Sequence, residues 1–299
     1  MKRWFHLLTP KKFIQLLVRK LGSGITYFGT EIARLSGYGK SVKSITLELQ
    51  QLLKEEGYNV SRKGKSICIN GINAADNFKY LIRPGTADKK VFDQVMYSGE
   101  YQPIVDIIKS RGGENSVKKI VDAGSNIGLT SIFFKKYYPK AIIMSIEAEG
   151  KNFNHQKKNI RLNGLNNTVK LFRNALWKNS TDKLYISNDF RDGESWSKSV
   201  TLDRKGNNYV KALTIRDIKN LYNKEDIIDI LKIDVEGAEA ELFRDQDFVM
   251  VLKTSVKFLC LEIHDELNIR QDIHATFSKI GFSFQEIGEV CFCVNKNLI

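Results

Sequence analysis

The stretch Lys118–Glu149 reads KKIVDAGSNIGLTSIFFKKYYPKAIIMSIEAE and decides the fold. It predicts a β-branched strand, a turn that contains Gly124 and Gly128, an amphipathic helix, and a second apolar strand that ends at Glu147. This order of elements is typical of α/β sheets that bind an adenosine-containing cofactor. The sequence therefore predicts a cofactor site at the glycine turn.

The residues of the turn discriminate between cofactors. Gly124 and Gly128 lack a Cβ, so the backbone can turn sharply and leave room for a ligand at the helix N-terminus. Glu147 follows about 20 residues later, where an acid accepts hydrogen bonds from both ribose hydroxyls. The G-x-G-x-x-G pattern of a dinucleotide site is absent, because Asp122 precedes the first glycine and Asn126 lies between the two. An acid there repels a pyrophosphate and suits the cationic methionine end of S-adenosylmethionine. The alternative is a turn that serves only tight packing.

Strands and helices alternate from Lys118 to the end of the chain. Such alternation predicts a mostly parallel sheet with helices on both faces. The expected strands are at Val121, Ala141–Glu147, Val169–Asn174, Ile227–Asp234 and Val256–His264, the expected helices are Ile127–Tyr138, Asn152–Asn163 and Asp265–Lys279, and two short final strands lie within Gly281–Val294. A polar insertion, Lys178–Asn208 with Trp196, interrupts this alternation.

The first 115 residues have a different pattern. The expected elements are a helix over Ser44–Glu56 that ends at Gly57, two extended runs within Asn59–Arg83 separated by the turn signal Asn70-Gly71, and a helix over Ala87–Tyr97. We therefore expect residues 1–82 to form a basic extension of helices and a possible β-hairpin. Residues 83–299 would form one catalytic domain with its core sheet in 118–299.

The basic charge is concentrated in the amino-terminal part. The net charge is +13, and residues 1–90 hold 17 Lys or Arg against 6 Asp or Glu. Met1–Leu21 interleaves six basic residues with apolar ones and contains no acid. This basic amphipathic segment fits an anionic membrane surface, and the alternative is a helix docked on its own domain. Nucleic acid is disfavoured because no reading module is present.

The apolar runs and the cysteines indicate where in the cell the protein is located. No apolar run is long enough for a signal-peptide core or a membrane span. The four cysteines form no C-x-x-C pair and no zinc set with the four histidines, so we expect buried thiols: Cys68, Cys260, Cys291 and Cys293. These features predict a cytoplasmic protein, with peripheral membrane contact as the open alternative.

Acids and a histidine follow two of the later strands. One apolar strand runs into IDVEGAE, and the next ends in LEIH. Ligands of open α/β sheets bind beyond the carboxyl ends of the strands. We therefore expect Asp234, Glu236, Glu262 and His264 to face the same crevice as the glycine turn.

These residue types suit methyl transfer to an alcohol. The attacking oxygen must lie about 3 Å from the methyl group while a base takes its proton. His264 titrates nearest neutrality and is the expected base. Asp234, Glu236 and Glu262 would orient it, bind the substrate, or hold a divalent metal ion together with His264. Asp234 would alternatively bind the ammonium group of the cofactor.

Plainer interpretations of the same residues stay open. Glu239 and Glu241 fall in the first turns of a helix, where acids stabilise the helix dipole. Glu236 would be a capping acid of the same kind. His264 would be a buried structural histidine.

Several motifs in one order carry a family resemblance. VDAGSNIGLTSIFF, SIEAE, NALW, LKIDVEGAEAELF and LEIH, preceded by RPGTADKKVFDQVMYSGEY, resemble the FkbM-type S-adenosylmethionine-dependent methyltransferases from Arg83 to His264. The resemblance implies a class I, Rossmann-like fold with a mostly parallel seven-stranded sheet and a C-terminal antiparallel hairpin. It also implies O-methylation of a hydroxyl in a sugar, polysaccharide or secondary metabolite, and it leaves the acceptor open.

The resemblance assigns roles to individual residues. Glu147 would bind the ribose, while Asp234, Glu236 and His264 would face the methyl group and the acceptor. Glu100 and Tyr101 would close over the pocket, or else form an ordinary helix terminus. The methionine part of the cofactor would contact Asp122, Gly124, Ser125, Asn126 and Gly128, and the adenine would contact Ala148, Asn174 and Ala175.

Two other function classes fit the sequence less well. A base-modifying methyltransferase predicts an Asn-Pro-Pro-aromatic motif where this chain has Asp-Val-Glu-Gly. A non-catalytic protein at a membrane surface or on nucleic acid predicts an eroded site. The glycine turn, Glu147 and the acidic strand ends are all present.

Overall fold

The computed structural model describes residues 42–71, 73, 76–113, 115–187, 199–202, 209–223 and 226–299. The basic amphipathic segment Met1–Leu21 and Trp196 lie outside the described residues, so the predictions for them stay predictions. Over the described ranges, no helix combines the length and the apolar character that crossing a bilayer requires.

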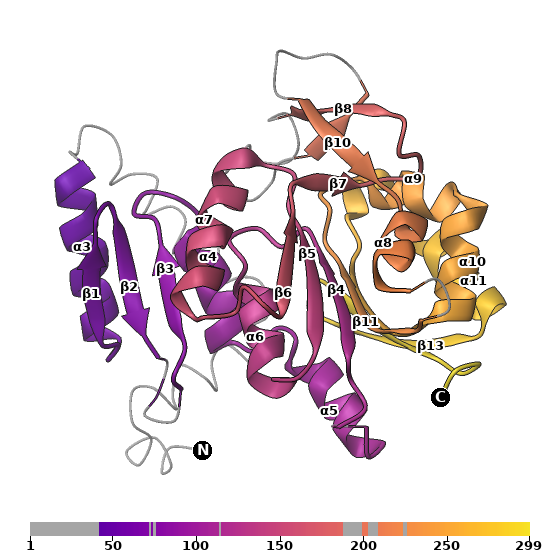
Figure 1. Cartoon of the computed structure of the whole chain (residues 1–299), viewed down its shortest axis with the longest axis horizontal. Helices are drawn as coiled ribbons and strands as arrows, with labels where there is room; N and C mark the ends of the chain where they lie inside the picture. The colour runs from indigo at the N-terminus through magenta and orange to yellow at the C-terminus, as the bar shows by residue number, and fades with distance from the viewer. Residues whose placement is uncertain are drawn as a thin grey trace, which may run out of the picture.

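Seven strands form the central sheet, in the order β13-β14-β12-β11-β4-β5-β6 (Figure 1). Five of them are parallel: β4 (Lys119–Ala123), β5 (Ile142–Ile146), β6 (Val169–Phe172), β11 (Ile228–Ile233) and β12 (Val256–Glu262). The last two form the antiparallel hairpin: β13 (Phe282–Ile287) and β14 (Val290–Asn295). The predicted class I sheet and its C-terminal hairpin are confirmed.

Helices cover both faces of this sheet because neighbouring strand residues point to opposite sides. Ile120 and Ile230 pack into one apolar cluster, and the next residues along, Val121 and Leu231, pack into another. The first cluster is covered by α5 (Gln102–Ser110), α6 (Leu129–Tyr137) and α7 (Gly150–Leu162). The second is covered by α8 (Ile215–Tyr222), α10 (Gln246–Ser255) and α11 (Arg270–Ile280), while the short α9 (Glu239–Arg244) follows β11.

The amino-terminal part contains one strand more than predicted. The expected helix is α3 (Val42–Glu55), and an antiparallel sheet follows: β1 (Val60–Lys63), β2 (Ser66–Asn70) and β3 (Lys79–Ile82). Asn70-Gly71 does end β2, but the first extended run is itself a hairpin that turns at Gly64, where φ is +60°. A two-residue turn with a left-handed glycine closes such a hairpin tightly. The helix predicted over Ala87–Tyr97 is α4 (Asp88–Phe92) continued by the π-helical turn η1 (Asp93–Tyr97).

This small sheet is joined to α7 by side-chain amides. The amide of Asn159 accepts a hydrogen bond from Leu81 N at 2.7 Å and donates to Leu81 O at 3.1 Å and to Ile127 O at 2.9 Å. The amide of Asn163 likewise accepts a hydrogen bond from Lys79 N and donates one to Lys79 O. We call this contact between β3 and α7 the seam, and Asn163 lies at its exposed end. Apolar residues of β2 and β3 also belong to the same buried cluster as those of β4 and α6. The domain boundary at residue 82 stays a prediction.

The segment between β6 and α8, which contains the predicted insertion, forms a second sheet above the central one in Figure 1, in the order β7-β10-β8-β9. The strand predicted over Val169–Asn174 ends at Phe172, and Asn174 already belongs to this second sheet. Its strands are β7 (Asn174–Leu176), β8 (Lys183–Ser187), β9 (Ser199–Thr201) and β10 (Tyr209–Leu213).

Candidate functional site

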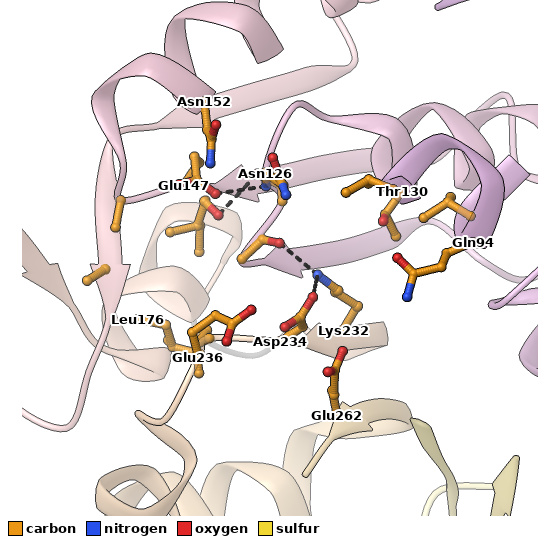
Figure 2. Close-up of a pocket in the computed structure, with 18 of the residues that line it drawn as sticks. Gln94, Asn126, Thr130, Glu147, Asn152, Leu176, Lys232, Asp234, Glu236 and Glu262 are labelled. Carbon is orange, nitrogen blue, oxygen red and sulfur yellow. Dashed lines mark hydrogen bonds and ion pairs between the residues drawn. The ribbon is translucent and has the colours of Figure 1, made fainter. Parts of the chain in front are cut away.

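A cavity that is partly open to solvent lies beyond the carboxyl ends of the central strands. Figure 2 shows side chains from several elements directed into it. Most of the predicted site residues line it: Glu100, Tyr101, Gly124, Ser125, Asn126, Glu147, Ala148, Asn174, Ala175, Asp234, Glu236 and Glu262. Three predicted residues, Asp122, Gly128 and His264, do not line it.

The glycine turn is shaped by packing against its neighbours. Gly124 has a φ of +77°, and a Cβ on it would lie 1.6 Å from the carbonyl oxygen of Asp234 at the end of β11. Gly128 has a φ of +85°, and a Cβ there would lie 2.9 Å from Cγ of Gln156. The positive φ values agree with the predicted sharp turn. The absent Cβ atoms also let the turn approach β11 and α7 closely, and Gly124 lines the cavity.

Glu147 lies at the end of β5 with its carboxylate against the turn. Its Oε2 accepts a hydrogen bond from Asn126 N at 2.8 Å (Figure 2), and its Oε1 accepts one from Glu149 N at 2.7 Å. Burial raises the pKa of Glu147 to about 7, although these two backbone hydrogen bonds lower it. A carboxylate oxygen has a second lone pair, so Glu147 can accept further hydrogen bonds from a ligand in the cavity.

Asp122 lies behind the turn and not in the cavity. Its side chain is fully buried, and its Oδ2 accepts a hydrogen bond from Ser131 Oγ at 2.6 Å. Its Oδ1 lies 3.7 Å from Nζ of Lys232. Burial raises the pKa of Asp122, and the charge of Lys232 opposes this. The predicted direct contact between Asp122 and the cofactor is therefore replaced by a contact with Lys232.

Lys232 is a site residue that the sequence interpretation missed. Its side chain is 2% exposed, and Nζ donates to Gly124 O at 2.8 Å and to Asp234 Oδ2 at 3.3 Å (Figure 2). Burial alone lowers the pKa of Lys232, but the charges of Asp234 and Asp122 raise it above its usual value. Lys232 therefore stays cationic and ties the end of β11 to the glycine turn. A lysine within the predicted buried strand IIDILKID was the available signal.

Three carboxylates line the cavity beside β11 and β12, and we call them the acidic wall. Asp234 and Glu236 follow β11, and Glu262 ends β12 and points towards Lys232 and Asp234 in Figure 2. Burial and the negative charge of Asp234 raise the pKa of Glu262 well above its usual range. The same two causes raise the pKa of Glu100 to about 7. The acids predicted to converge in space do line one cavity.

His264 lies behind this wall and is fully buried. Its Nδ1 lies 2.9 Å from Oε1 of Glu239, and its Nε2 lies 3.3 Å from Oε2 of Glu236 and 3.6 Å from Oε1 of Glu262. Burial alone lowers the pKa of His264, but hydrogen bonds to Glu236 and Glu239 and the charges of Glu239 and Glu262 raise it to about 11. A protonated, buried ring cannot take a proton from an acceptor. The interpretation of His264 as the general base is therefore corrected.

Glu239 has a larger role than a helix-dipole acid. It is fully buried, and its carboxylate accepts hydrogen bonds from Val235 N at 3.3 Å and Gly237 N at 2.9 Å in addition to its contact with His264. These bonds hold a turn in which Glu236 has a φ of +49° and Gly237 a φ of +97°. Its position in the sequence resembles that of any first-turn acid, so only the fold reveals this role.

Residues just before α5 also line the cavity. Tyr101 is 2% exposed, and its ring centre lies 5.9 Å from that of Phe134, so the start of α5 is anchored in the core. Glu100 and Tyr101 line the cavity there, while the proposed closing motion stays a prediction. Further lining residues that the sequence interpretation did not name are Val91, Gln94, Val95, Thr130, Ile146, Asn152, Leu176, Val200, Val235 and Glu289.

The chain is similar to known methyltransferases. The model of the family described as the methyltransferase FkbM domain matches residues 122–287, more than half of the chain. The chain is 28% identical over 198 residues to the methyltransferase sdnD of Sordaria araneosa, a match that covers 54% of this chain and 73% of that protein.

Two solved structures illustrate the structural similarity. A methyltransferase FkbM from Methylobacillus flagellatus KT aligns with a TM-score of 0.42 and 13% identity, over 59% of this chain and 43% of that one. This chain thus spans less than half of that protein. The N-terminal domain of human METTL16 aligns with a TM-score of 0.40 and 12% identity, over 86% of this chain and 81% of that one.

The family match covers the glycine turn, the end of β5, the acidic ends of β11 and β12, and β13. The glycine turn, the end of β5 and the acidic strand ends line the cavity and also carry the sequence resemblance. The chain therefore belongs to the FkbM methyltransferase family.

Proposed function

We propose that this methyltransferase uses S-adenosylmethionine and transfers the methyl group to a hydroxyl of a small molecule or glycan. One observation carries the proposal. A single cavity joins the glycine turn and Glu147 to the carboxylates of Asp234, Glu236 and Glu262. We assign the glycine turn and Glu147 to the donor half, and Glu236 and Glu262 to the acceptor half. We assign Asp234 to both, so that donor and acceptor would meet in one space, as in-line transfer requires.

The donor half suits an adenosine bound to a sulfonium. S-adenosylmethionine supplies an electrophilic methyl group on a positively charged sulfur. Glu147 would accept the ribose hydroxyls, since each of its oxygens already accepts one backbone hydrogen bond and can accept another. Ala148, Asn174 and Ala175 would border the adenine. The negative charges of Asp234 and Glu100 would favour the cationic end.

A carboxylate, and not His264, would take the proton of the acceptor. Glu236 and Glu262 both line the cavity and both lie near the His264 ring. As the hydroxyl oxygen attacks the methyl carbon, one of these carboxylates would accept the hydroxyl proton. His264, held by Glu239, would keep the two carboxylates in place through its contacts with them.

The acidic wall also favours one acceptor class. Carboxylate oxygens accept hydrogen bonds from hydroxyl groups, which a sugar offers in numbers. The same wall would repel the phosphates of a nucleic acid. A neutral polyhydroxylated acceptor is therefore the best match, and a nucleic acid the poorest.

The experiment labels the transferred carbon. The protein is incubated with ¹³C-methyl S-adenosylmethionine and a panel of sugars, oligosaccharides and other polyols, and the products are examined by mass spectrometry and ¹³C NMR. We expect an O-methyl carbon and an equal amount of S-adenosylhomocysteine. A label that appears only as an N-methyl or S-methyl carbon would overturn the proposed acceptor chemistry.

A further inference from the structure

Three side chains beyond β11 and β12 lie close enough together to share one cation. Asp234, Glu262 and His264 each offer a ligand atom, and these atoms lie within 4.8 Å of one another. A divalent cation binds oxygen and nitrogen donors at about 2.0–2.4 Å, so neighbouring donors in its shell lie roughly 3–5 Å apart. The spacing of the three side chains therefore matches a ligand set.

The ring of His264 is held with one nitrogen towards the carboxylates. Nδ1 lies 2.9 Å from Oε1 of Glu239, and both side chains are fully buried. Nε2 lies on the other side of the ring, 3.3 Å from Oε2 of Glu236 and 3.6 Å from Oε1 of Glu262. A metal-binding histidine ordinarily donates its second ring N–H to a carboxylate, which fixes its tautomer and orientation. Glu239 lies in the position of that carboxylate, and this observation is independent of the acids that face the cavity.

The position of the three donors leaves one side for a ligand. Asp234 and Glu262 line the cavity, whereas His264 lies behind them. A cation bound by all three would contact protein on one side and the cavity on the other. That is the geometry of a catalytic site with an open coordination position and not of a closed structural site.

A second group in the described part of the chain has similar spacing but different surroundings. His274, Glu286 and Cys291 also lie within 4.8 Å of one another. Glu286 is engaged by Arg270, and Cys291 is fully buried in β14. None of these residues lines the cavity. This group therefore serves as a control.

We propose that Asp234, Glu262 and His264 bind a divalent cation on the acceptor side of the cavity. Two carboxylate oxygens and one neutral imidazole nitrogen suit Mn²⁺ when solvent or substrate oxygens complete the shell. The cation would take the place of the Nε2 proton of His264, so binding would release that proton. Because the three donors come from two neighbouring strand ends, the site exists only in the folded chain.

The role of the cation rests on the proposed function. An acceptor hydroxyl oxygen bound to the cation becomes more acidic. With Glu262 engaged as a ligand, Glu236 would take the hydroxyl proton. The oxygen forms its bond to the methyl carbon as the bond between carbon and sulfur breaks. S-adenosylhomocysteine leaves with the electron pair of that bond on its sulfur.

The test uses Mn²⁺ alone, without an acceptor. The full-length protein is titrated with Mn²⁺, and the free ion is followed by electron paramagnetic resonance. We expect one bound Mn²⁺ per chain and an affinity at least tenfold lower in Glu262→Gln and in Asp234→Asn. His274→Asn is the matched control and should bind as the unsubstituted protein does. Absence of binding above a non-specific level, or unchanged binding in Glu262→Gln, would overturn the site.

Further measurements distinguish a failure of the cation site from misfolding and from a failure of the proposed function. An unchanged melting temperature and unchanged S-adenosylhomocysteine binding show that Glu262→Gln is folded. If the protein binds Mn²⁺ but yields no O-methyl product, the proposed function fails and the cation site stands. If a chelated, metal-free protein keeps its full O-methylation rate, the catalytic role of the cation fails and the proposed function stands.

Discussion

Glu147 illustrates how one side chain serves the fold and the ligand together. Its oxygens accept the N–H groups of Asn126 and Glu149, so the carboxylate is held at a fixed place before any ligand arrives. A preorganised acceptor binds more tightly because less ordering is needed on binding. The same burial that holds the carboxylate raises its pKa to about 7.

Replacement of this carboxylate should weaken cofactor binding. Glu147→Gln keeps the shape but replaces one acceptor oxygen with a donor. We expect the affinity for S-adenosylhomocysteine, measured by isothermal titration calorimetry, to fall by roughly 10- to 100-fold. Glu149→Gln changes a neighbouring carboxylate that caps α7 and does not line the cavity. Equal affinities in the two variants would contradict the assignment of Glu147.

The raised pKa of Glu147 also predicts a pH dependence. Ribose hydroxyls donate to the ionised form, so binding favours the carboxylate and releases a proton when Glu147 starts protonated. The affinity for S-adenosylhomocysteine should therefore rise as the pH increases through about 7 and level off above it. Glu100 also has a raised pKa of about 7. The comparison is thus between Glu147→Gln, which should flatten the dependence, and Glu100→Gln, which should preserve it.

At the scale of the elements, the ends of β4 and β11 approach so closely that side chains decide whether they fit. Gly124 touches the backbone of β11, and Lys232 reaches from β11 back to the carbonyl of Gly124. The contact at Gly124 requires a residue without a side chain. The contact made by Lys232 requires a long cationic side chain.

The glycine contact predicts a large loss of stability. In Gly124→Ala, the new Cβ would collide with the Asp234 carbonyl at 1.6 Å, and the φ of +77° would be strained. We expect the protein to fail to fold, or to lose more than roughly 4 kcal/mol of unfolding free energy in urea denaturation. Gly164→Ala is the matched control, because its φ is +67° and its Cβ would meet open space. It should lose only about 1–2 kcal/mol. Similar losses in both variants would contradict the close approach.

The lysine contact predicts a second effect. Lys232→Met leaves the buried Asp122 and the partly buried Asp234 without their shared cation. We expect a loss of roughly 3–5 kcal/mol of unfolding free energy, because an uncompensated charge stays buried. Lys119→Met removes a more exposed pair with Asp226 and should cost less than about 1 kcal/mol. Urea denaturation of both variants at neutral pH distinguishes these outcomes.

For the whole molecule, the small sheet β1-β2-β3 and the central sheet share one apolar cluster and one seam along α7. Asn159 binds the backbone of Leu81 in β3 and that of Ile127 beside the glycine turn. These hydrogen bonds therefore connect the amino-terminal sheet to the glycine turn of the site.

The seam predicts coupled unfolding of the two sheets. Asn159→Ala leaves buried backbone groups without their partner, and we expect a loss of roughly 2–4 kcal/mol in a single unfolding transition. Asn163→Ala removes the same kind of pairing at an exposed position and should cost less than about 1 kcal/mol, since water replaces the amide. Two separate transitions in Asn159→Ala, followed by circular dichroism and tryptophan fluorescence, would show that the sheets unfold independently.

The sequence by itself determined the alternation of strands and helices and the final hairpin, because apolar periodicity and glycine turns act over a few residues. The family followed from the resemblance of several motifs in one order. The sequence also identified most residues of the cavity wall, since strand ends in a parallel sheet meet at one edge. Only the tertiary structure decided which side chains face the cavity. His264 and Asp122 turned out to lie behind it, Lys232 and Glu239 proved to be central, and the glycines proved to serve packing as well as the turn. The reason is physical: burial and charge at each of these positions come from residues far away in the chain, and no local pattern encodes them.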